Sequence, residues 1–257
     1  MLKTLIFLLS FFSVSTFGAE VSISGHPDYP PIIWESGGTL KGASVELIAI
    51  ALKNLGHKPI LVPLGTWGRA QAEVKGGRVD ILLPPYKTPE REKYYSFSEG
   101  PLFLDRTVIF MKKGKSIKFK SYKDLRSYDG IAIVNDSFGD KFDKADKKYG
   151  LLKRMSKTQQ SLEFLLKNRA DYLVAGERAV TSLISNLGLD GKFDIHEQVI
   201  LETGMYSAIS KKSSFNNKPF KESFFREISR LIEEDRQKKL LIKALDDYSS
   251  EKGLLEQ

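Results

Sequence analysis

The chain has 257 residues, of which 28% are charged and 41% are hydrophobic, and its formal net charge is +8. This length allows one large domain or two small ones, and the composition is that of an ordinary globular protein with a substantial core. The sequence contains no cysteine, which excludes disulfide bonds and a lipid-attachment cysteine.

The N-terminus has the pattern of a secretory signal peptide. Lys3 precedes an apolar run over residues 5–14, and small residues allow cleavage after Gly18 or Ala19. The run is too short to span a bilayer. We therefore expect residues 1–18 to be removed and the protein to be released into the periplasm.

The positive net charge does not by itself indicate a nucleic-acid partner, because an exported protein has little access to nucleic acid. Lysines are dense over residues 112–123 and 141–157. We interpret these segments as a solvated basic surface in preference to a polyanion-binding site, and we expect no nucleic-acid partner.

The first part of the mature chain alternates strand and helix patterns. Apolar residues at positions 45, 48, 52 and 55 recur at helical spacing, and Pro84 and Pro85 end a strand abruptly. In chain order we expect a strand at 21–24, a rigid proline loop at 25–31, a helix at 42–56, a strand at 59–62, a helix at 69–74 and a strand at 79–83. This alternation predicts an α/β fold with a mostly parallel sheet and right-handed crossovers.

The remaining chain repeats the alternation after a change in composition. A β-rich run at 107–111 passes abruptly into a basic segment at 112–115, which we interpret as the passage into a second lobe. We expect strands at 131–134, around 152, at 172–174 and at 205–210, helices at 138–148, 158–167, 177–186, 219–234 and 236–245, and a polar tail at 248–257. The predicted division is a first lobe of residues 19–110 and 205–257 and a second lobe of residues 111–204.

The loop after the strand at 79–83 is the predicted binding segment. In open α/β sheets, ligands bind in the crevice outside the carboxyl ends of the strands. This loop carries Tyr86, Thr88 and Arg91. A guanidinium matches a carboxylate bidentately, so Arg91 is the first candidate for anion binding, with a surface arginine capping the loop as the alternative.

The same region resembles a known family. The patterns W-x-R-A from Trp67, G-G-R-V-D from Gly76 and Y-x-T-P-E-R from Tyr86 are similar to those of the family 3 extracellular solute-binding proteins. That family includes the polar amino-acid receptors of bacterial ABC importers. The resemblance implies two α/β lobes joined by two crossing strands, a small-molecule ligand and a membrane permease as partner. It implies no cofactor, and we expect a monomer.

The resemblance also implies roles for residues of the first lobe. Arg91 corresponds to the arginine that clamps the α-carboxylate of the ligand. Tyr29 and Trp67 correspond to aromatic residues that would enclose an apolar or cationic side chain. Arg69 is a second anion contact or an interlobe salt bridge, and the sequence does not separate these two readings.

In the second lobe the candidates are Asp136, Ser137 and Glu177, each of which follows a predicted strand. By resemblance, a carboxylate here would hold a ligand ammonium, although Asp136 could instead cap the following helix. The sequence departs from the family at three places. Asp136 and Ser137 stand where a glycine-threonine turn is usual. Gly176 stands where the acid is usual, with Glu177 one residue later, and Pro84 and Pro85 lack backbone N–H donors for a ligand.

Three functions follow from these observations. The predicted function is a periplasmic solute-binding protein that delivers an amino acid or related carboxylate to an ABC importer, and not an enzyme. The alternatives are a cyclohexadienyl-dehydratase-like enzyme with Glu177 as its acid, and a soluble sensor. His26, His57 and His196 have no metal-ligand spacing, so we interpret them as loop or surface residues and expect no metal site.

Overall fold

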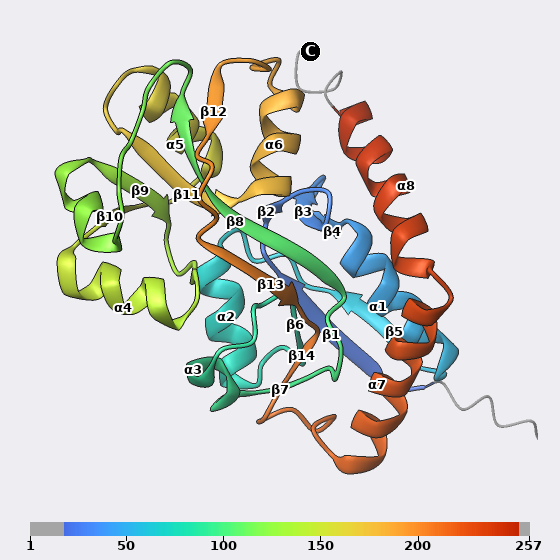
Figure 1. Cartoon of the computed structure of the whole chain (residues 1–257). Coiled ribbons are helices and arrows are strands. Elements are labelled where there is room, and N and C mark those ends of the chain that lie inside the picture. The colour runs from blue at the N-terminus through green and yellow to red at the C-terminus, as the bar shows by residue number, and fades with distance from the viewer. Residues whose placement is uncertain (1–17, 252–257) are drawn as a thin grey trace, which may run out of the picture.

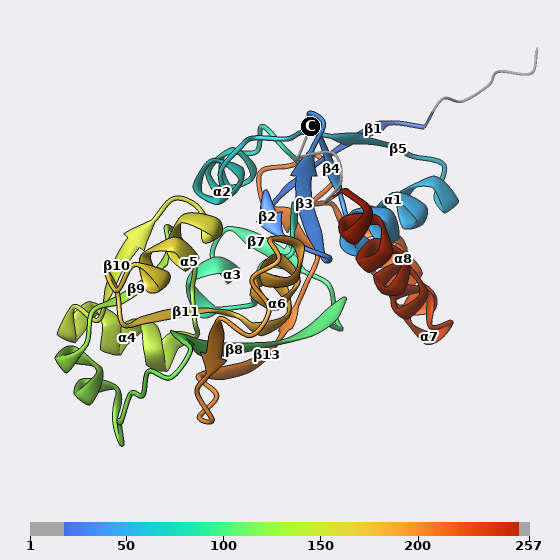
Figure 2. The same ribbon diagram turned by 90° about the horizontal axis from the view of Figure 1, so that it is seen from above.

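The computed structural model describes residues 18–251, which form two α/β lobes side by side (Figures 1 and 2). The predicted signal peptide lies outside the described residues except for Gly18. Within the described part, no helix has both the length and the apolar character needed to cross a membrane.

The first lobe is built on a five-stranded sheet in the order β5-β1-β6-β14-β7. The strands β5, β1 and β6 are parallel, and β14 is antiparallel to β6 and β7. The strands are β1 (Glu20–Gly25), β5 (Lys58–Leu61), β6 (Ile81–Leu83), β7 (Tyr95–Phe97) and β14 (Ala208–Ser210). The helices are α1 (Ala43–Asn54), α2 (Trp67–Gly76), α3 (Pro89–Glu92), α7 (Lys218–Glu233) and α8 (Arg236–Ser250).

Helices α1, α7 and α8 pack against one another and bury one stripe each. In α7 the stripe consists of Phe220, Phe224, Ile228 and Leu231, at the three- and four-residue spacing of a helix. A glycine beyond each of α1 and α2 helps to end it, because Gly56 and Gly77 adopt positive φ angles. The helices α1, α2 and α7 agree with the sequence-based expectations.

The second lobe is built on a six-stranded sheet in the order β10-β9-β11-β8-β12, with β13 also paired to β8. The strands β10, β9 and β11 on one side of this sheet are parallel, and β8 is antiparallel to β11, β12 and β13. The strands are β8 (Phe103–Lys112), β9 (Gly130–Ile133), β10 (Leu152–Met155), β11 (Tyr172–Gly176), β12 (Phe193–Ile195) and β13 (Leu201–Met205). The helices are η1 (Tyr122–Ser127), α4 (Asp140–Tyr149), α5 (Thr158–Leu166) and α6 (Glu177–Asn186).

The strands β8 and β13 run across the centre of the molecule and connect the lobes (Figure 1). They pair antiparallel from Phe103 opposite Met205 to Thr107 opposite Leu201. The predicted boundary between residues 110 and 111 falls inside β8. The residue limits of the two lobes stay a prediction.

Two segments differ from the sequence-based expectations. The expected single strand at 205–210 is divided, because Met205 ends β13 in the second sheet while Ala208 begins β14 in the first. The expected polar tail from residue 248 begins inside α8. Tyr248 is buried there, with its ring centroid 5.2 Å from that of Trp34, so the apolar stripe of α8 continues for one more turn.

The expected proline loop at 25–31 contains the start of a small third sheet. This sheet has three strands, β2 (Asp28–Tyr29), β3 (Ile33–Ser36) and β4 (Thr39–Lys41). Tyr29 pairs with Ile33, and Ile33 is fully buried in the core of the first lobe. This pairing fixes the position of Tyr29 at the interface between the lobes.

Candidate ligand-binding cleft

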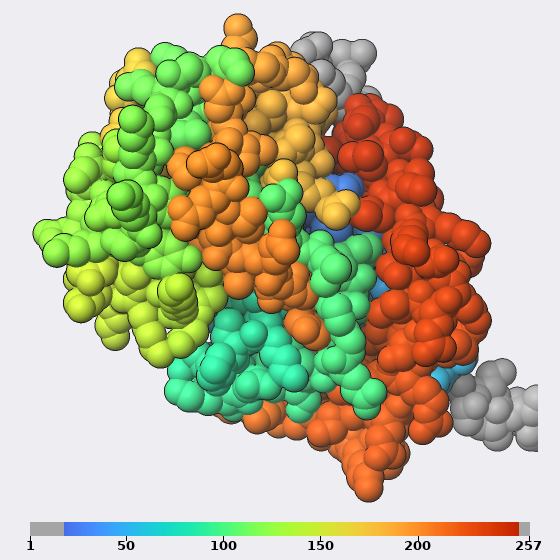
Figure 3. All heavy atoms as spheres, in the orientation of Figure 1, coloured from blue at the N-terminus to red at the C-terminus, as the bar shows by residue number. Residues whose placement is uncertain are grey.

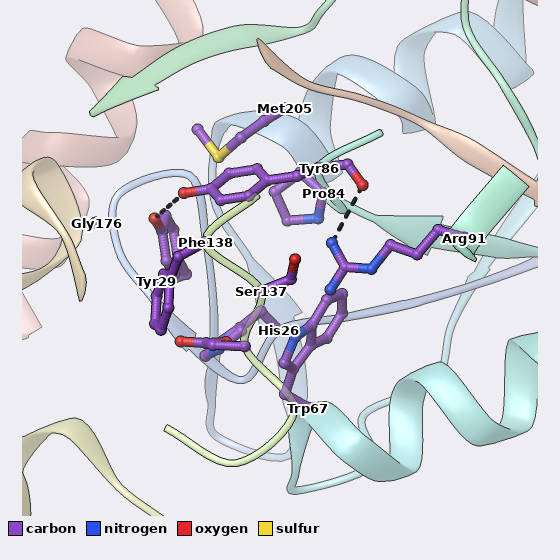
Figure 4. Close-up of a pocket in the computed structure, with 11 residues that line it drawn as sticks. His26, Tyr29, Trp67, Pro84, Tyr86, Arg91, Ser137, Phe138, Gly176 and Met205 are labelled. Carbon is purple, nitrogen blue, oxygen red and sulfur yellow. Dashed lines mark hydrogen bonds and ion pairs between the residues drawn. The ribbon is translucent and has the colours of Figure 1, made fainter. Parts of the chain in front are cut away.

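A small cavity lies between the lobes, where loops at the carboxyl ends of the parallel strands meet (Figure 4). Its volume is about 30 Å³, which is room for about two water molecules. The lining residues come from both lobes and are His26, Tyr29, Trp67, Pro84, Tyr86, Arg91, Asp136, Ser137, Phe138, Gly176 and Met205. An amino acid can therefore enter only when the lobes move apart.

Arg91 forms one end of the cavity. Thr88 caps α3 by accepting the N–H of Arg91 at 3.3 Å, which holds the base of the side chain. The guanidinium donates from Nη1 to the carbonyl oxygen of Tyr86 at 3.1 Å and from Nη2 to Oε1 of Gln71 at 3.4 Å. The ring centroid of Trp67 lies 5.7 Å from the guanidinium carbon.

The charge of Arg91 has no counter-ion within the described part of the chain. Its side chain is only 9% exposed, yet no carboxylate there lies within ion-pair distance. Burial lowers the pKa of Arg91, and the more distant charge of Asp136 opposes this effect. A buried cation of this kind is stabilised by an anion that arrives with a ligand.

Aromatic rings form one wall of the cavity. His26 contacts Tyr29 edge to face at a centroid distance of 5.3 Å and Trp67 at 5.2 Å. His26 lies on a loop, as expected, but it is only 5% exposed because these rings cover it. Tyr29 and Trp67 were expected to enclose a side chain of the solute, but the ring of His26 occupies part of the space between them.

His26 also connects the two lobes. Its Nδ1 accepts the N–H of Asp28 at 3.0 Å, which leaves Nε2 as the ring nitrogen that can donate to the second lobe. That Nε2 lies 3.6 Å from Oδ1 of Asp136 in the second lobe. Asp28 itself accepts the N–H of Thr158 at 3.2 Å, so a second polar contact joins the lobes at this edge.

Two tyrosines form the other end of the cavity, and the carboxylate of Asp105 lies behind them, at the base of the groove on the outer side of the crossing strands. Tyr29 and Tyr86 each donate their hydroxyl proton to Oδ2 of Asp105 at 2.5 Å, and their two oxygens are 3.2 Å apart. Asp105 belongs to the crossing strand β8 and is 4% exposed. Burial raises the pKa of Asp105 and also raises the pKa of both tyrosines, which stay neutral donors.

The second lobe closes the cavity with two loops. After β9, Ser137 donates to Oδ2 of Asp143 at 2.5 Å, and Oδ1 of Asp143 accepts the N–H of Phe138 at 2.8 Å. Asp136 is not the cap of α4, because Gly139 occupies that position. After β11, Gly176 lies against the hydroxyl of Tyr29, and a Cβ built on it would be 1.7 Å from that oxygen.

Comparison with known protein families shows which family this chain belongs to. The sequence matches the bacterial extracellular solute-binding proteins, family 3, over residues 21–246. The chain belongs to this family. The resemblance read from the sequence motifs is therefore confirmed. No curated protein matches the sequence significantly.

Solved structures confirm the two-lobe α/β fold expected of a family 3 protein. A mutant of ArgBP from T. maritima is 19% identical, with a TM-score of 0.73 over 88% of this chain and 95% of that one. The arginine-, lysine-, histidine-binding protein ArtJ from Geobacillus stearothermophilus is 18% identical, with a TM-score of 0.71 over 87% and 94%. A histidine kinase sensor domain is 20% identical, with a TM-score of 0.74 over 88% and 95%. At these identities the likeness shows the fold alone.

Most of the expected site residues of this family 3 chain meet at the cavity. Those that line it are Tyr29, Trp67, Tyr86, Arg91, Asp136 and Ser137. Thr88 lies just outside, in an adjoining cleft of about 620 Å³ that shares Arg91 and Ser137. Arg69 is exposed, lines neither space and takes part in no ion pair with the described residues. Binding of a ligand by any of them stays a prediction.

Glu177 does not reach the cavity. It lines a groove of about 910 Å³ on the outer side of the crossing strands, between α6 and α8, where Figure 3 shows a hollow. Its Oε2 pairs with Nη1 of Arg106 at 2.9 Å. Glu177 is the first residue of α6, and its side chain points away from the cleft that Gly176 faces.

The sequence reasoning missed His26, Phe138, Met205 and above all Asp105. A signal for Asp105 was present, because Phe103, Asp105 and Thr107 alternate with exposed Leu104 and Arg106 along one strand. The alternation places the carboxylate on the buried face. Among the described residues, no cluster of three or more acidic, histidine or cysteine side chains could hold a metal ion.

Proposed function

We propose that this protein is a periplasmic binding protein that captures an amino acid or related carboxylate and delivers it to an ABC importer. The family assignment supports the solute-binding role. The predicted signal peptide supports the periplasmic location, and an ABC permease is the partner usual for such a protein. We propose no enzymatic activity.

The observation that carries the proposal is the buried and unpaired guanidinium of Arg91. Two of its N–H groups bond to Tyr86 and Gln71, and the group has further donors available in a planar fork. A carboxylate matches this fork, and the contact is strong in a cleft shielded from water. A carboxylate-bearing solute therefore supplies the missing counter-ion.

The lobes close around the solute because some contacts between them form only in the closed state. His26 of the first lobe faces Asp136 of the second, and Gly176 covers Tyr29. A solute held first by Arg91 would gain contacts with the second lobe when the lobes close. Because the solute binds the closed state better, it shifts the population toward it, and a permease can recognise that shape.

A thermal-shift screen of the protein without residues 1–18 tests the proposal. The panel contains amino acids, amines, small carboxylates and prephenate, and the variants are Arg91→Ala and, as a matched control, Arg78→Ala. Arg78 is an exposed arginine paired with Glu73 on the same surface. A solute at about a hundred times its Kd stabilises the native protein by about 2.7 kcal/mol.

The expected result is that a carboxylate stabilises the wild type and the Arg78→Ala protein but not the Arg91→Ala protein. If no carboxylate stabilises the wild type, or if Arg91→Ala responds equally well, the proposal fails. Turnover of prephenate would instead support the dehydratase. No structural observation favours that alternative, because Glu177, its expected acid, lies in the outer groove.

A further inference from the structure

The two polar ends of the cavity are joined by a single residue. The carbonyl oxygen of Tyr86 accepts a hydrogen bond from Arg91, while the hydroxyl of the same residue donates to Asp105. The two ends are therefore separated by the full length of a tyrosine side chain, as Figure 4 shows for the Arg91 and Tyr29 sides. A solute that contacts both ends must place its two polar groups equally far apart.

The end formed by Tyr29, Tyr86 and Asp105 is suited to a cation. Both hydroxyl protons point to Oδ2 of Asp105, and the Tyr86 oxygen can also accept from Oγ1 of Thr107 at 3.4 Å. Each hydroxyl oxygen therefore keeps at least one lone pair to accept from a donor in the cavity. The second oxygen, Oδ1, is buried and has no hydrogen-bond partner in the described part of the chain. The described residues also give Asp105 no ion pair. The negative charge of Asp105 therefore has no nearby counter-charge, just as the positive charge of Arg91 has none at the other end of the cavity.

We propose that the solute carries a cationic nitrogen several bonds away from its carboxylate, and that Asp105 selects this nitrogen through the hydroxyls of Tyr29 and Tyr86. The inference rests on the proposed function, since it takes Arg91 as the carboxylate contact. In an α-amino acid the ammonium and the carboxylate are attached to one carbon atom. That pair cannot span the length of the Tyr86 side chain, so the α-ammonium is not the group that Asp105 recognises.

The spacing of the two ends does not depend on closure. Arg91, Tyr86 and Tyr29 all belong to the first lobe, and Tyr86 is tied to β13 by a β-bridge to Met205. Separation of the second lobe removes Ser137, Phe138 and Gly176 and enlarges the cavity, but it leaves these three side chains in place. The spacing is thus set within the first lobe, and Asp105 completes the cation-binding end when the lobes close.

Isomeric ligands separate this inference from the general proposal. The probes are 4-aminobutanoate, 5-aminopentanoate and 6-aminohexanoate, each compared with the 2-amino isomer and with the unsubstituted carboxylate of the same carbon number. Binding is measured by titration calorimetry with the wild type, Asp105→Asn and Tyr86→Phe. The matched control is Glu202→Gln, which removes an exposed carboxylate from the neighbouring strand β13.

We expect one terminal amino carboxylate to bind the wild type and the control about tenfold or more tightly than its 2-amino isomer and the plain carboxylate, the difference of one hydrogen bond to a charged group. Asp105→Asn should abolish this preference while still binding the plain carboxylate through Arg91. Tyr86→Phe should reduce the preference with the carboxylate of Asp105 intact. A purely structural Asp105 would lower all three affinities in parallel.

The inference is overturned if the 2-amino isomers or plain carboxylates bind as tightly as the terminal amino compounds, or if the preference survives in Asp105→Asn. It is also overturned if none of these probes binds while amino acids without a cationic side chain stabilise the protein through Arg91. In that last case the proposed function stands and only the solute class is wrong.

Discussion

Replacement of Gly176 by alanine tests whether lobe closure brings Gly176 onto the Tyr29 hydroxyl. Gly176 has a φ of −65° and a ψ of 125°, which alanine adopts without strain. The added Cβ would lie 1.7 Å from the hydroxyl oxygen of Tyr29, so in the closed state that hydroxyl must move away from Asp105. The carboxylate of Asp105, 2.9 Å from the Cβ, belongs to the same sheet and would rotate slightly in the open and closed states alike.

The magnitude follows from the bond that is lost. A hydrogen bond to a charged group contributes about 1.5–3 kcal/mol, and its loss in the closed state alone weakens solute affinity about ten- to a hundredfold. In the open state Tyr29 moves away with the first lobe, whereas Asp105 stays in the sheet of Gly176, so the Tyr29–Asp105 bond is already absent there and the substitution costs little. We therefore expect the melting temperature without solute to stay within a few degrees of the wild type.

The assay is calorimetric titration of the solute that stabilises the wild type most, together with small-angle scattering with and without that solute. Gly100→Ala is the matched control, since nothing lies within 4 Å of a Cβ at that position. Gly176→Ala should bind weakly and keep the scattering profile of the open form. Unchanged affinity together with normal compaction would refute the closure geometry.

Three further substitutions test the charges, the cap and the core. Burial raises the pKa of Asp105 above its unfolded value of about 3.9, so this group favours the folded state below that pH and loses its contribution as the pH rises through the folded pKa. Asp105→Asn without solute should therefore gain in melting temperature relative to the wild type as the pH rises from about 4 to 8, and a flat or reversed difference contradicts this. Thr88→Ala removes the cap of α3 and should cost about 1 kcal/mol of stability. Because Arg91 is then misplaced, carboxylate affinity measured by titration should fall several-fold. An unchanged affinity would show that the cap does not position Arg91. Phe224→Ala leaves a cavity in the core of the first lobe and should cost about 3–5 kcal/mol in urea unfolding, and a loss below about 1 kcal/mol would contradict the packing.

The sequence predicts well the elements that have a strong local pattern. The helices α1 and α7 follow from apolar residues at helical spacing, and β6 ends where Pro84 and Pro85 remove N–H donors. The small sheet of β2, β3 and β4 was not predictable in this way. Its strands are too short to show a period, and they form because Ile33 is pulled into the core of the first lobe.

Sheet membership is a second property that local pattern does not contain. Residues 205–210 were expected to form one strand, but Met205 and Ala208 pair with different sheets. What divides them is the position of β8 and β6 in space, which depends on pairings far away in the sequence. The same limit explains why Tyr248 was read as part of a tail although it packs on Trp34.

At the candidate site, the sequence motif around Arg91 could be recognised. The buried charged group at the other end of the cavity, Asp105, could not be recognised from a motif. Tyr29, Tyr86 and Arg91 could be selected because each follows a strand end in a recognisable pattern. Asp105 lies inside a strand, at a position where a buried acid gives no motif. Glu177 was selected by its place after β11, but a shift of one residue at the start of α6 turns its side chain to the outer groove.

The two under-compensated charges give a physical reason for coupling between binding and closure. In the closed state without solute, Arg91 is buried without an anion, and Asp105 is buried without a cation. They do not neutralise each other, because the Tyr86 side chain separates them. A buried charge costs free energy until it is paired, so the empty closed state carries a penalty at both ends.

In the open state the withdrawal of the second lobe admits water to both ends and relieves part of that penalty. A solute with matching charges removes both penalties at once, and it does so most in the closed state. The free energy of pairing is then the differential affinity that shifts the equilibrium toward closure.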